Sequence, residues 1–164
     1  MSKGEQQAIN FWRFVASLAM CYGAAFIGSF FTRTEITQWY AFLKKPIFTP
    51  PGWVFAPVWF LLYFLMAVSL YLVWRRGLRI EKERMAFGLF IIHLIFNAFW
   101  SIVFFGFHEI FFALIVIIVL WIMIYSLIFQ FYRINKFACY LLVPYLVWVS
   151  YASFLNFFLW LLNR

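Results

Sequence analysis

Hydrophobic residues fill the chain in five long stretches, which are separated by short polar or charged segments. An α-helix needs about 20 apolar residues to cross the hydrocarbon core of a bilayer, and each stretch is long enough to do so. The predicted spans are residues 9–31, 51–74, 85–107, 110–132 and 137–160. The stretches are continuous and do not alternate in period two, which excludes a transmembrane β-barrel. We therefore predict an all-α membrane protein, with residues 1–164 forming a single bundle of five transmembrane helices.

One predicted connection differs from the others in its length and composition. The loop between the first and second helices covers residues 32–50 and is rich in aromatic residues and proline, whereas the remaining loops are short. Two prolines stand where the second helix begins, a position at which the missing proline N–H costs nothing. Trp39, Tyr40 and Trp53 add rings that prefer the interface between membrane and water. A simple tether needs only a few polar residues, so this segment favours a folded lid over a tether.

The composition agrees with a lipid environment. Hydrophobic residues make up 68% of the chain and charged residues 11%, whereas a soluble domain is roughly half apolar and a quarter charged. The polar surface is too small to cover a water-soluble protein, so a lipid bilayer is the expected surrounding. Cys21 and Cys139 lie inside apolar stretches without a CxxC partner, which favours packing over redox chemistry, and no metal site is predicted.

The basic residues orient the predicted bundle. The formal net charge is +8, but the Lys and Arg residues flank the apolar stretches, which indicates membrane anchoring and argues against a nucleic-acid partner. Nine of them fall on the side of the N-terminus and of the second and fourth loops, and four fall on the opposite side. Cytoplasmic segments carry the excess of Lys and Arg. The N-terminus is therefore predicted in the cytoplasm, with the C-terminus and the first loop outside.

Three blocks of aromatic residues, prolines and asparagines form a recognisable pattern. The first, WYxxLxKPxxxPPxWxFxPVWxxLY, occupies residues 39–63; the second, NAFW followed by FF, occupies residues 97–105; the third, PYLVW followed by A and LNF, occupies residues 144–157. Together they resemble the signature of the TspO/MBR family, the tryptophan-rich sensory proteins and translocator proteins once called peripheral benzodiazepine receptors. The resemblance covers the second to fifth helices, and the first helix is similar only in character.

The resemblance implies a five-helix bundle with a cavity that opens toward the first loop, which closes it. Members of the family bind porphyrins such as protoporphyrin, and animal members bind cholesterol and isoquinoline or benzodiazepine-type drugs. Some bacterial members are similar to slow, light- and oxygen-dependent porphyrin-degrading enzymes. The sterol motif of animal members is broken here, because Phe157 replaces its tyrosine. This departure and the predicted orientation favour a multi-pass protein of a bacterial plasma membrane.

The expected ligand-binding residues are carried over from the positions that match the family pattern. Trp59 and Trp148 are the pair expected to bind the ligand and, in an enzyme, to act as the catalytic, redox-active rings. Aromatic residues in a bundle most often serve packing, but indole rings inside these helices also make a flat slot that suits a tetrapyrrole or fused aromatic ligand. The remaining expected ligand-binding residues are Trp39, Tyr40, Trp53, Tyr63, Asn97, Trp100 and Ala152.

Polar residues are rare within the predicted spans. His93, Asn97 and Trp100 share one face of the third helix. His93 either ligates a metalloporphyrin or bonds a neighbouring helix, and the second reading is favoured because the family pattern has no histidine there. Asn97 needs a partner in hydrocarbon, which is either a helix or a ligand. No Asp occurs in the chain and no Glu lies inside a span, so a carboxylate relay for proton-driven transport is missing. His108 and Glu109, in a short turn, are expected to be solvated.

Two functions from different classes follow. The first is an integral membrane receptor or carrier for tetrapyrroles, which acts in porphyrin sensing or homeostasis. The alternative is a light- and oxygen-dependent enzyme that degrades porphyrins, in which the ligand itself supplies the chemistry. A passive scaffold with a vestigial cavity is the least favoured reading. No cofactor is required, since the partner is a porphyrin or other hydrophobic aromatic small molecule as ligand or substrate. A homodimer stays open, because family members are often dimeric but small residues are sparse along the third helix.

Overall fold

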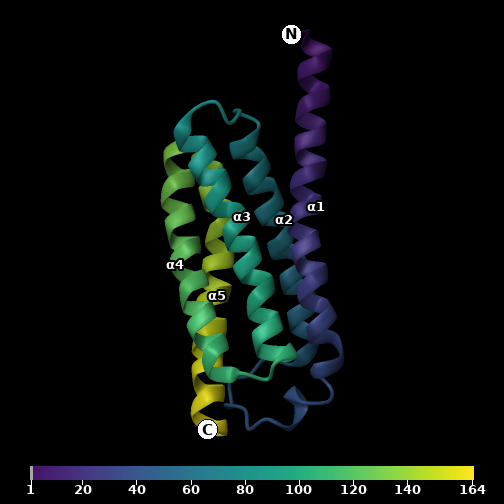
Figure 1. The fold of residues 1–164 in the computed structure, drawn as a ribbon, viewed down its shortest axis with the longest axis vertical. Helices are drawn as coiled ribbons and strands as arrows, with labels where there is room; N and C mark the ends of the chain where they lie inside the picture. Colours follow the sequence, from purple (N-terminus) through teal and green to yellow (C-terminus); the bar gives the residue numbers. More distant parts are fainter. Residues whose placement is uncertain (1) are drawn as a thin grey trace.

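The computed structural model describes residues 2–164 and shows an all-helical protein (Figure 1). Five helices are long and apolar enough to cross a membrane, and the described residues contain no β-strand. The helices are α1 (Lys3–Glu35), α2 (Phe55–Trp74), α3 (Glu81–Ser101), α4 (Ile110–Ile134) and α5 (Lys136–Asn163). The predicted fold class, an all-α membrane protein with five transmembrane helices, is confirmed.

The first and last helices begin outside the predicted apolar stretches because polar side chains cap them. Ser2 Oγ accepts a hydrogen bond from the N–H of Glu5 (3.2 Å), and the Glu5 carboxylate accepts one from the N–H of Ser2 (2.7 Å), which forms a capping box. α1 therefore begins at Lys3 instead of residue 9, and its first turns project beyond the other helices (Figure 1). Asn135 caps α5 by accepting two backbone hydrogen bonds. Hydropathy marks the part of a helix that suits lipid, whereas the cap marks where the helix begins.

The second and third helices differ from their predicted spans in their internal geometry. The second span was predicted from residue 51, but a 3₁₀ turn at Gly52–Val54 precedes α2. The third span ends as an α-helix at Ser101 and continues as a π-helical turn, Ile102–Gly106. In this turn the N–H of Phe107 donates to the carbonyl of Ile102 over 3.0 Å. A π-turn widens the helix locally and is frequent at functional sites.

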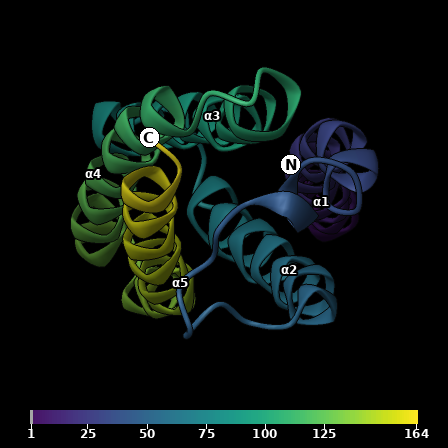
Figure 2. The same ribbon diagram turned by 90° about the horizontal axis from the view of Figure 1, so that it is seen from below.

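The helices form a closed ring when the bundle is viewed along its axis (Figure 2). α1 packs against α2 and α3, α4 packs against α3 and α5, and α5 also packs against α2. The interior is filled near the α2–α3 and α4–α5 connections, and we call this part the packed half. Its large side chains have no exposed surface and include Met66, Leu70, Phe90, Phe131 and Tyr145. The other half, next to the first loop, is called the loop half.

The first loop crosses the end of the loop half (Figure 2). It runs from α1 over to α5 and returns to α2. The Asn163 side chain at the end of α5 donates to the carbonyl of Lys44 and accepts from its N–H, both over 2.9 Å. The Tyr151 hydroxyl donates to the carbonyl of Phe48 over 2.6 Å. These bonds fasten the middle of the loop to a helix that lies more than a hundred residues further along the chain.

Candidate functional site

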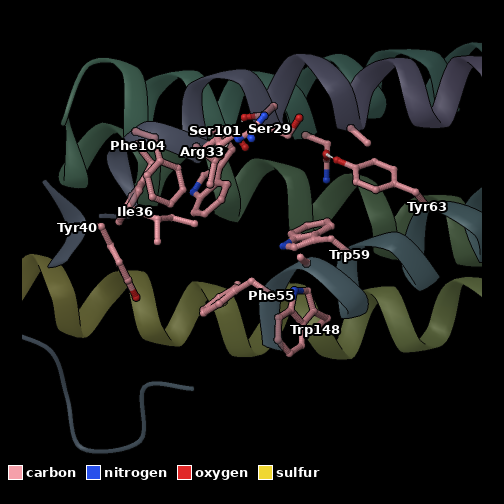
Figure 3. A pocket seen from close by; sticks show the side chains of 18 of the residues that line it. Ser29, Arg33, Ile36, Tyr40, Phe55, Trp59, Tyr63, Ser101, Phe104 and Trp148 are labelled. Carbon is pink, nitrogen blue, oxygen red and sulfur yellow. Dashed lines mark hydrogen bonds between the residues drawn. The ribbon is translucent and has the colours of Figure 1, made fainter. Parts of the chain in front are cut away.

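The loop half contains a cavity of about 640 Å³ (Figure 3). Its walls come from α1, α2, α5, the end of α3 with the π-turn, and the first loop, and none of the lining residues that the structure describes comes from α4. Sites for small molecules have volumes of roughly 300–1,000 Å³ and mostly apolar walls with a few placed polar groups. The cavity has this size, and aromatic side chains form much of its lining.

Seven of the nine expected ligand-binding residues line this cavity. They are Tyr40, Trp59, Tyr63, Asn97, Trp100, Trp148 and Ala152. Trp39 and Trp53 lie outside it. Trp39 stacks on the ring of His108 with centroids 4.3 Å apart, and Trp53 is 76% exposed. Their part in ligand binding stays a prediction, as does that of the seven lining residues.

Trp59 and Trp148 lie on neighbouring walls at one side of the cavity (Figure 3). The ring of Trp59 on α2 packs against Tyr63, with centroids 5.6 Å apart. The ring of Trp148 on α5 meets Phe55 edge to face at 5.9 Å. Trp148 Nε1 is buried and has no hydrogen-bond partner within residues 2–164. Aromatic contacts thus hold both indoles at the cavity wall, where a flat ligand has access to them.

Asn97 marks the inner end of the cavity and joins three helices. Its side-chain oxygen accepts a hydrogen bond from the Tyr63 hydroxyl of α2, and its nitrogen donates to the Tyr145 hydroxyl of α5 over 2.9 Å. The question left open by the sequence is therefore answered, because Asn97 finds its partners on neighbouring helices. A buried amide that is satisfied in this way fixes the distance between helices. The network separates the cavity from the packed half.

A second polar network supports the opposite wall. Trp100 Nε1 donates to the side-chain oxygen of Asn156 over 3.2 Å, and the Asn156 nitrogen donates to the carbonyl of Ile110 over 3.0 Å. The ring of Trp100 stacks on Phe104 of the π-turn, with centroids 5.3 Å apart. Phe104, Phe105 and Asn156 line the cavity but were not among the expected site residues. Their signal was present, because all three belong to the family-like blocks.

Tyr40 is the residue that the first loop contributes from its 3₁₀ turn, Tyr40–Phe42. Its ring lies 5.9 Å from that of Phe105, and Lys45 Nζ stands 4.9 Å above it. Burial, with a smaller effect of nearby Tyr151, raises the pKa of Tyr40 to about 12. The Tyr40 hydroxyl therefore stays neutral at physiological pH and is available as a hydrogen-bond donor at the mouth of the cavity.

The two histidines have different surroundings. His93 is fully buried, its Nδ1 bonds the carbonyl of Phe90 in its own helix, and it does not line the cavity. This geometry favours a structural role for His93 over metalloporphyrin ligation. The expectation that His108 is merely solvated was wrong. His108 Nε2 donates to the Glu35 carboxylate over 2.9 Å while its ring stacks on Trp39.

His108 also has an unusual backbone conformation. Its φ of 58° lies in the left-handed region, which side chains other than glycine and asparagine rarely adopt. Such a conformation persists where contacts hold it in place. The pairing with Glu35 and the stacking on Trp39 supply these contacts, and they tie the α3–α4 turn to the end of α1 and to the first loop. Sequence reasoning could not find this clasp, because its members are far apart along the chain.

The cavity is suited to binding more than to acid–base chemistry. Its lining includes no Asp, Glu, His or Cys among the residues described. Within residues 2–164, no three His, Cys, Asp or Glu side chains lie together in a way that could hold a metal ion. The groups available to a ligand are aromatic faces, a few hydroxyl and amide groups, and one guanidinium. Such a site favours a flat apolar ring, and chemistry within it depends on the ligand or on the indoles.

Comparison with known proteins gives one consistent result. Residues 17–161 match the model of the TspO/MBR family. The "Tryptophan-rich protein TspO" of Archaeoglobus fulgidus is 42% identical over 155 residues, which cover 94% of this chain and 99% of the relative. The "Tryptophan-rich sensory protein" of Cereibacter sphaeroides is 35% identical over 144 residues, covering 88% and 87%. The human "Translocator protein" is 36% identical over 136 residues, covering 82% and 80%. The match with the family reaches into α1, where the sequence blocks gave no guidance.

Proposed function

The chain belongs to the TspO/MBR family, and from this premise we propose that it is a membrane receptor and carrier for tetrapyrroles such as protoporphyrin. It is an integral membrane protein that crosses the bilayer several times. In the proposed role it binds porphyrin in the loop-half cavity and serves porphyrin sensing or homeostasis. The names of its relatives, which refer to sensing and translocation, agree with a receptor or carrier.

One observation carries the proposal: the cavity is open, sufficiently large and walled by aromatic rings. Trp59, Trp100 and Trp148 present indoles from three different helices. Indole faces attract flat, polarisable rings, and stacked or edge-on aromatic pairs contribute about 0.5–1.5 kcal/mol each beyond area burial. A tetrapyrrole offers an extended flat ring system to all three walls. A small aliphatic ligand would use this geometry poorly.

The first loop is proposed to act as the lid of the cavity. Tyr40 reaches the cavity mouth, and the Lys44–Asn163 bonds hold the loop across the end of the bundle. The distribution of Lys and Arg supports a placement in a bacterial plasma membrane with the N-terminus in the cytoplasm. In that placement the loop and the C-terminus lie outside, and porphyrin enters or leaves on the outer side.

A second function is favoured by the location of Trp59 and Trp148 in the same cavity. In this function the bound porphyrin absorbs light, oxygen is the oxidant, and the indoles act as redox-active rings in porphyrin degradation. Binding is common to both functions. Only turnover distinguishes them.

The test is a titration of the purified protein in lipid nanodiscs with protoporphyrin, in the dark and then under light in air. Saturable quenching of tryptophan fluorescence in the dark supports the receptor, and it should weaken in Trp59→Phe and Trp148→Phe. The matched control is Trp12→Phe, because Trp12 is 65% exposed on α1 and lies outside the cavity. Loss of the porphyrin absorption band with a defined product would support the enzyme. Absence of saturable quenching would contradict both.

A further inference from the structure

The α1 wall of the cavity carries a charge that the proposed function does not use. Arg33 lies in the last turn of α1 and lines the cavity. Ser29 stands one turn earlier on the same helix, and Ser101 stands at the end of α3 (Figure 3). Among the lining residues that the structure describes, Arg33 is the one with a formal charge. An otherwise apolar, aromatic cavity therefore has a single positive group on one wall.

No acidic side chain of the described chain neutralises Arg33. The one ion pair within residues 2–164 joins His108 to Glu35, so the acid that follows Arg33 along the chain is already engaged. A guanidinium has five N–H donors and no acceptor, and it binds a carboxylate through two parallel hydrogen bonds. Arg33 thus offers an unused fork of donors beside the cavity.

The packing of α1 on α3 places a second donor next to this group. A Cβ atom on Gly28 would lie 3.1 Å from Ser101 Oγ, so the two helices are in close contact one turn before Arg33. The close approach holds the Ser101 hydroxyl at the same wall. Trp59 and Trp148 lie across the cavity from Ser29, Arg33 and Ser101 (Figure 3).

We infer that Arg33, assisted by Ser101, is a docking point for a carboxylate, and that the cavity selects flat aromatic ligands that carry an acid group. The ring system lies against the indoles, and the carboxylate reaches the α1 wall. The inference rests on the proposed function for its aromatic ligand, and it adds the chemical class that the site prefers. A structural role for Arg33, as an interface anchor or as a cation at a helix C-terminus, would not depend on the acid group of a ligand.

The test compares pyrenebutyrate with its methyl ester, which share the ring and differ in the charge. Energy transfer from tryptophan to pyrene reports binding to the protein in nanodiscs of zwitterionic phosphatidylcholine. The wild type should bind the acid roughly tenfold more tightly than the ester, as expected for a charge-assisted hydrogen bond that is partly open to solvent. Arg33→Gln should remove this preference by weakening the acid alone. Arg33→Lys should keep part of it, because lysine retains the charge but not the fork.

Lys44→Gln is the matched control, because it removes one positive charge at the same end of the molecule but outside the cavity. It should leave the acid preference unchanged. The inference is overturned if the wild type does not prefer the acid, if Arg33→Gln keeps the preference, or if Arg33→Gln weakens both probes equally. The last result would indicate a structural role.

A parallel titration with protoporphyrin and its dimethyl ester separates this inference from the proposed function. If protoporphyrin fails to bind while the pyrene probes show an acid preference that depends on Arg33, the proposed ligand is wrong and the docking point stands. If protoporphyrin and its ester bind equally well and Arg33→Gln changes neither, the docking point is wrong and the proposed function stands. If no probe binds the wild type, both are overturned.

Discussion

The packed half and the loop half are built from the same helices, but their interiors are organised differently. In the packed half, large side chains such as Phe90, Phe131 and Tyr145 interlock without exposed surface. In the loop half, Trp59 and Trp148 are only partly buried and stand around an open volume. Because every helix contributes apolar residues along its whole length, hydrophobicity alone does not explain the difference.

Polar side chains explain why the loop half stays open. An unfilled volume in a protein interior costs stability, because the atoms around it lose packing partners. Asn97 bonds α2 and α5, and Asn156 bonds Trp100 and the start of α4. These two networks hold the helices at distances that the aromatic rings do not fill. The comparison teaches that a few satisfied amides set the shape of an interior that apolar contacts would otherwise close.

The largest expected effect comes from truncating one phenylalanine in each half. Phe90→Ala removes a fully buried ring that stacks on Phe131, and it should lower the free energy of unfolding by roughly 3 kcal/mol. Phe55→Ala removes a ring that already faces the cavity, so its cost should stay below about 1 kcal/mol. Unfolding in mixed detergent micelles measures both. Equal losses for the two variants would mean that the loop half is packed as tightly as its counterpart.

A smaller effect is expected where α1 meets the π-turn. In Gly106→Ala the new Cβ would lie 2.9 Å from Cδ1 of Phe31, so α1 or the turn must move. Overpacking of this kind should cost about 1–2 kcal/mol in the same unfolding measurement. Gly88→Ala, which meets no atom within 4 Å on α3, is the control and should be neutral or stabilising. A neutral Gly106→Ala would show that the α1 wall of the cavity is loosely held.

The smallest effect concerns the clasp around His108. His108→Asn keeps a residue that tolerates the left-handed conformation but removes the ring that contacts Glu35 and Trp39. An exposed pair of this kind contributes about 0–1 kcal/mol. Hydrogen exchange should therefore become faster in the first loop and stay unchanged in the packed half. Unchanged exchange in the loop would show that the Lys44–Asn163 bonds are sufficient to hold it.

The sequence predicted the fold because the membrane constrains it strongly. Five apolar stretches of sufficient length leave a helical bundle as the expected solution, and the structure has that bundle. It also predicted most of the aromatic lining, because Trp59, Trp100 and Trp148 belong to blocks with a recognisable spacing. The extent of α1 was missed, since a capping box at Ser2 and Glu5 extends a helix beyond its apolar part.

The features that the sequence did not predict depend on contacts between distant segments. Arg33 counted only as a flanking charge, because its place in the cavity depends on how α1 crosses α3. The π-turn that carries Phe104 has no signature in an apolar run. His108 meets Glu35 across 73 residues of sequence. Hydropathy and local motifs do not contain this information.

Filling the cavity tests the central claim most directly. Ala152→Trp adds a large side chain to the cavity wall on α5, whereas Ala19→Trp adds the same side chain to an exposed position on α1. Protoporphyrin binding is measured for both variants by tryptophan quenching in nanodiscs, together with the unfolding midpoint. Our account predicts that Ala152→Trp lowers the affinity at least about tenfold with a near-normal midpoint, while Ala19→Trp binds like the wild type. Wild-type affinity in a folded Ala152→Trp variant would show that porphyrin does not bind in this cavity.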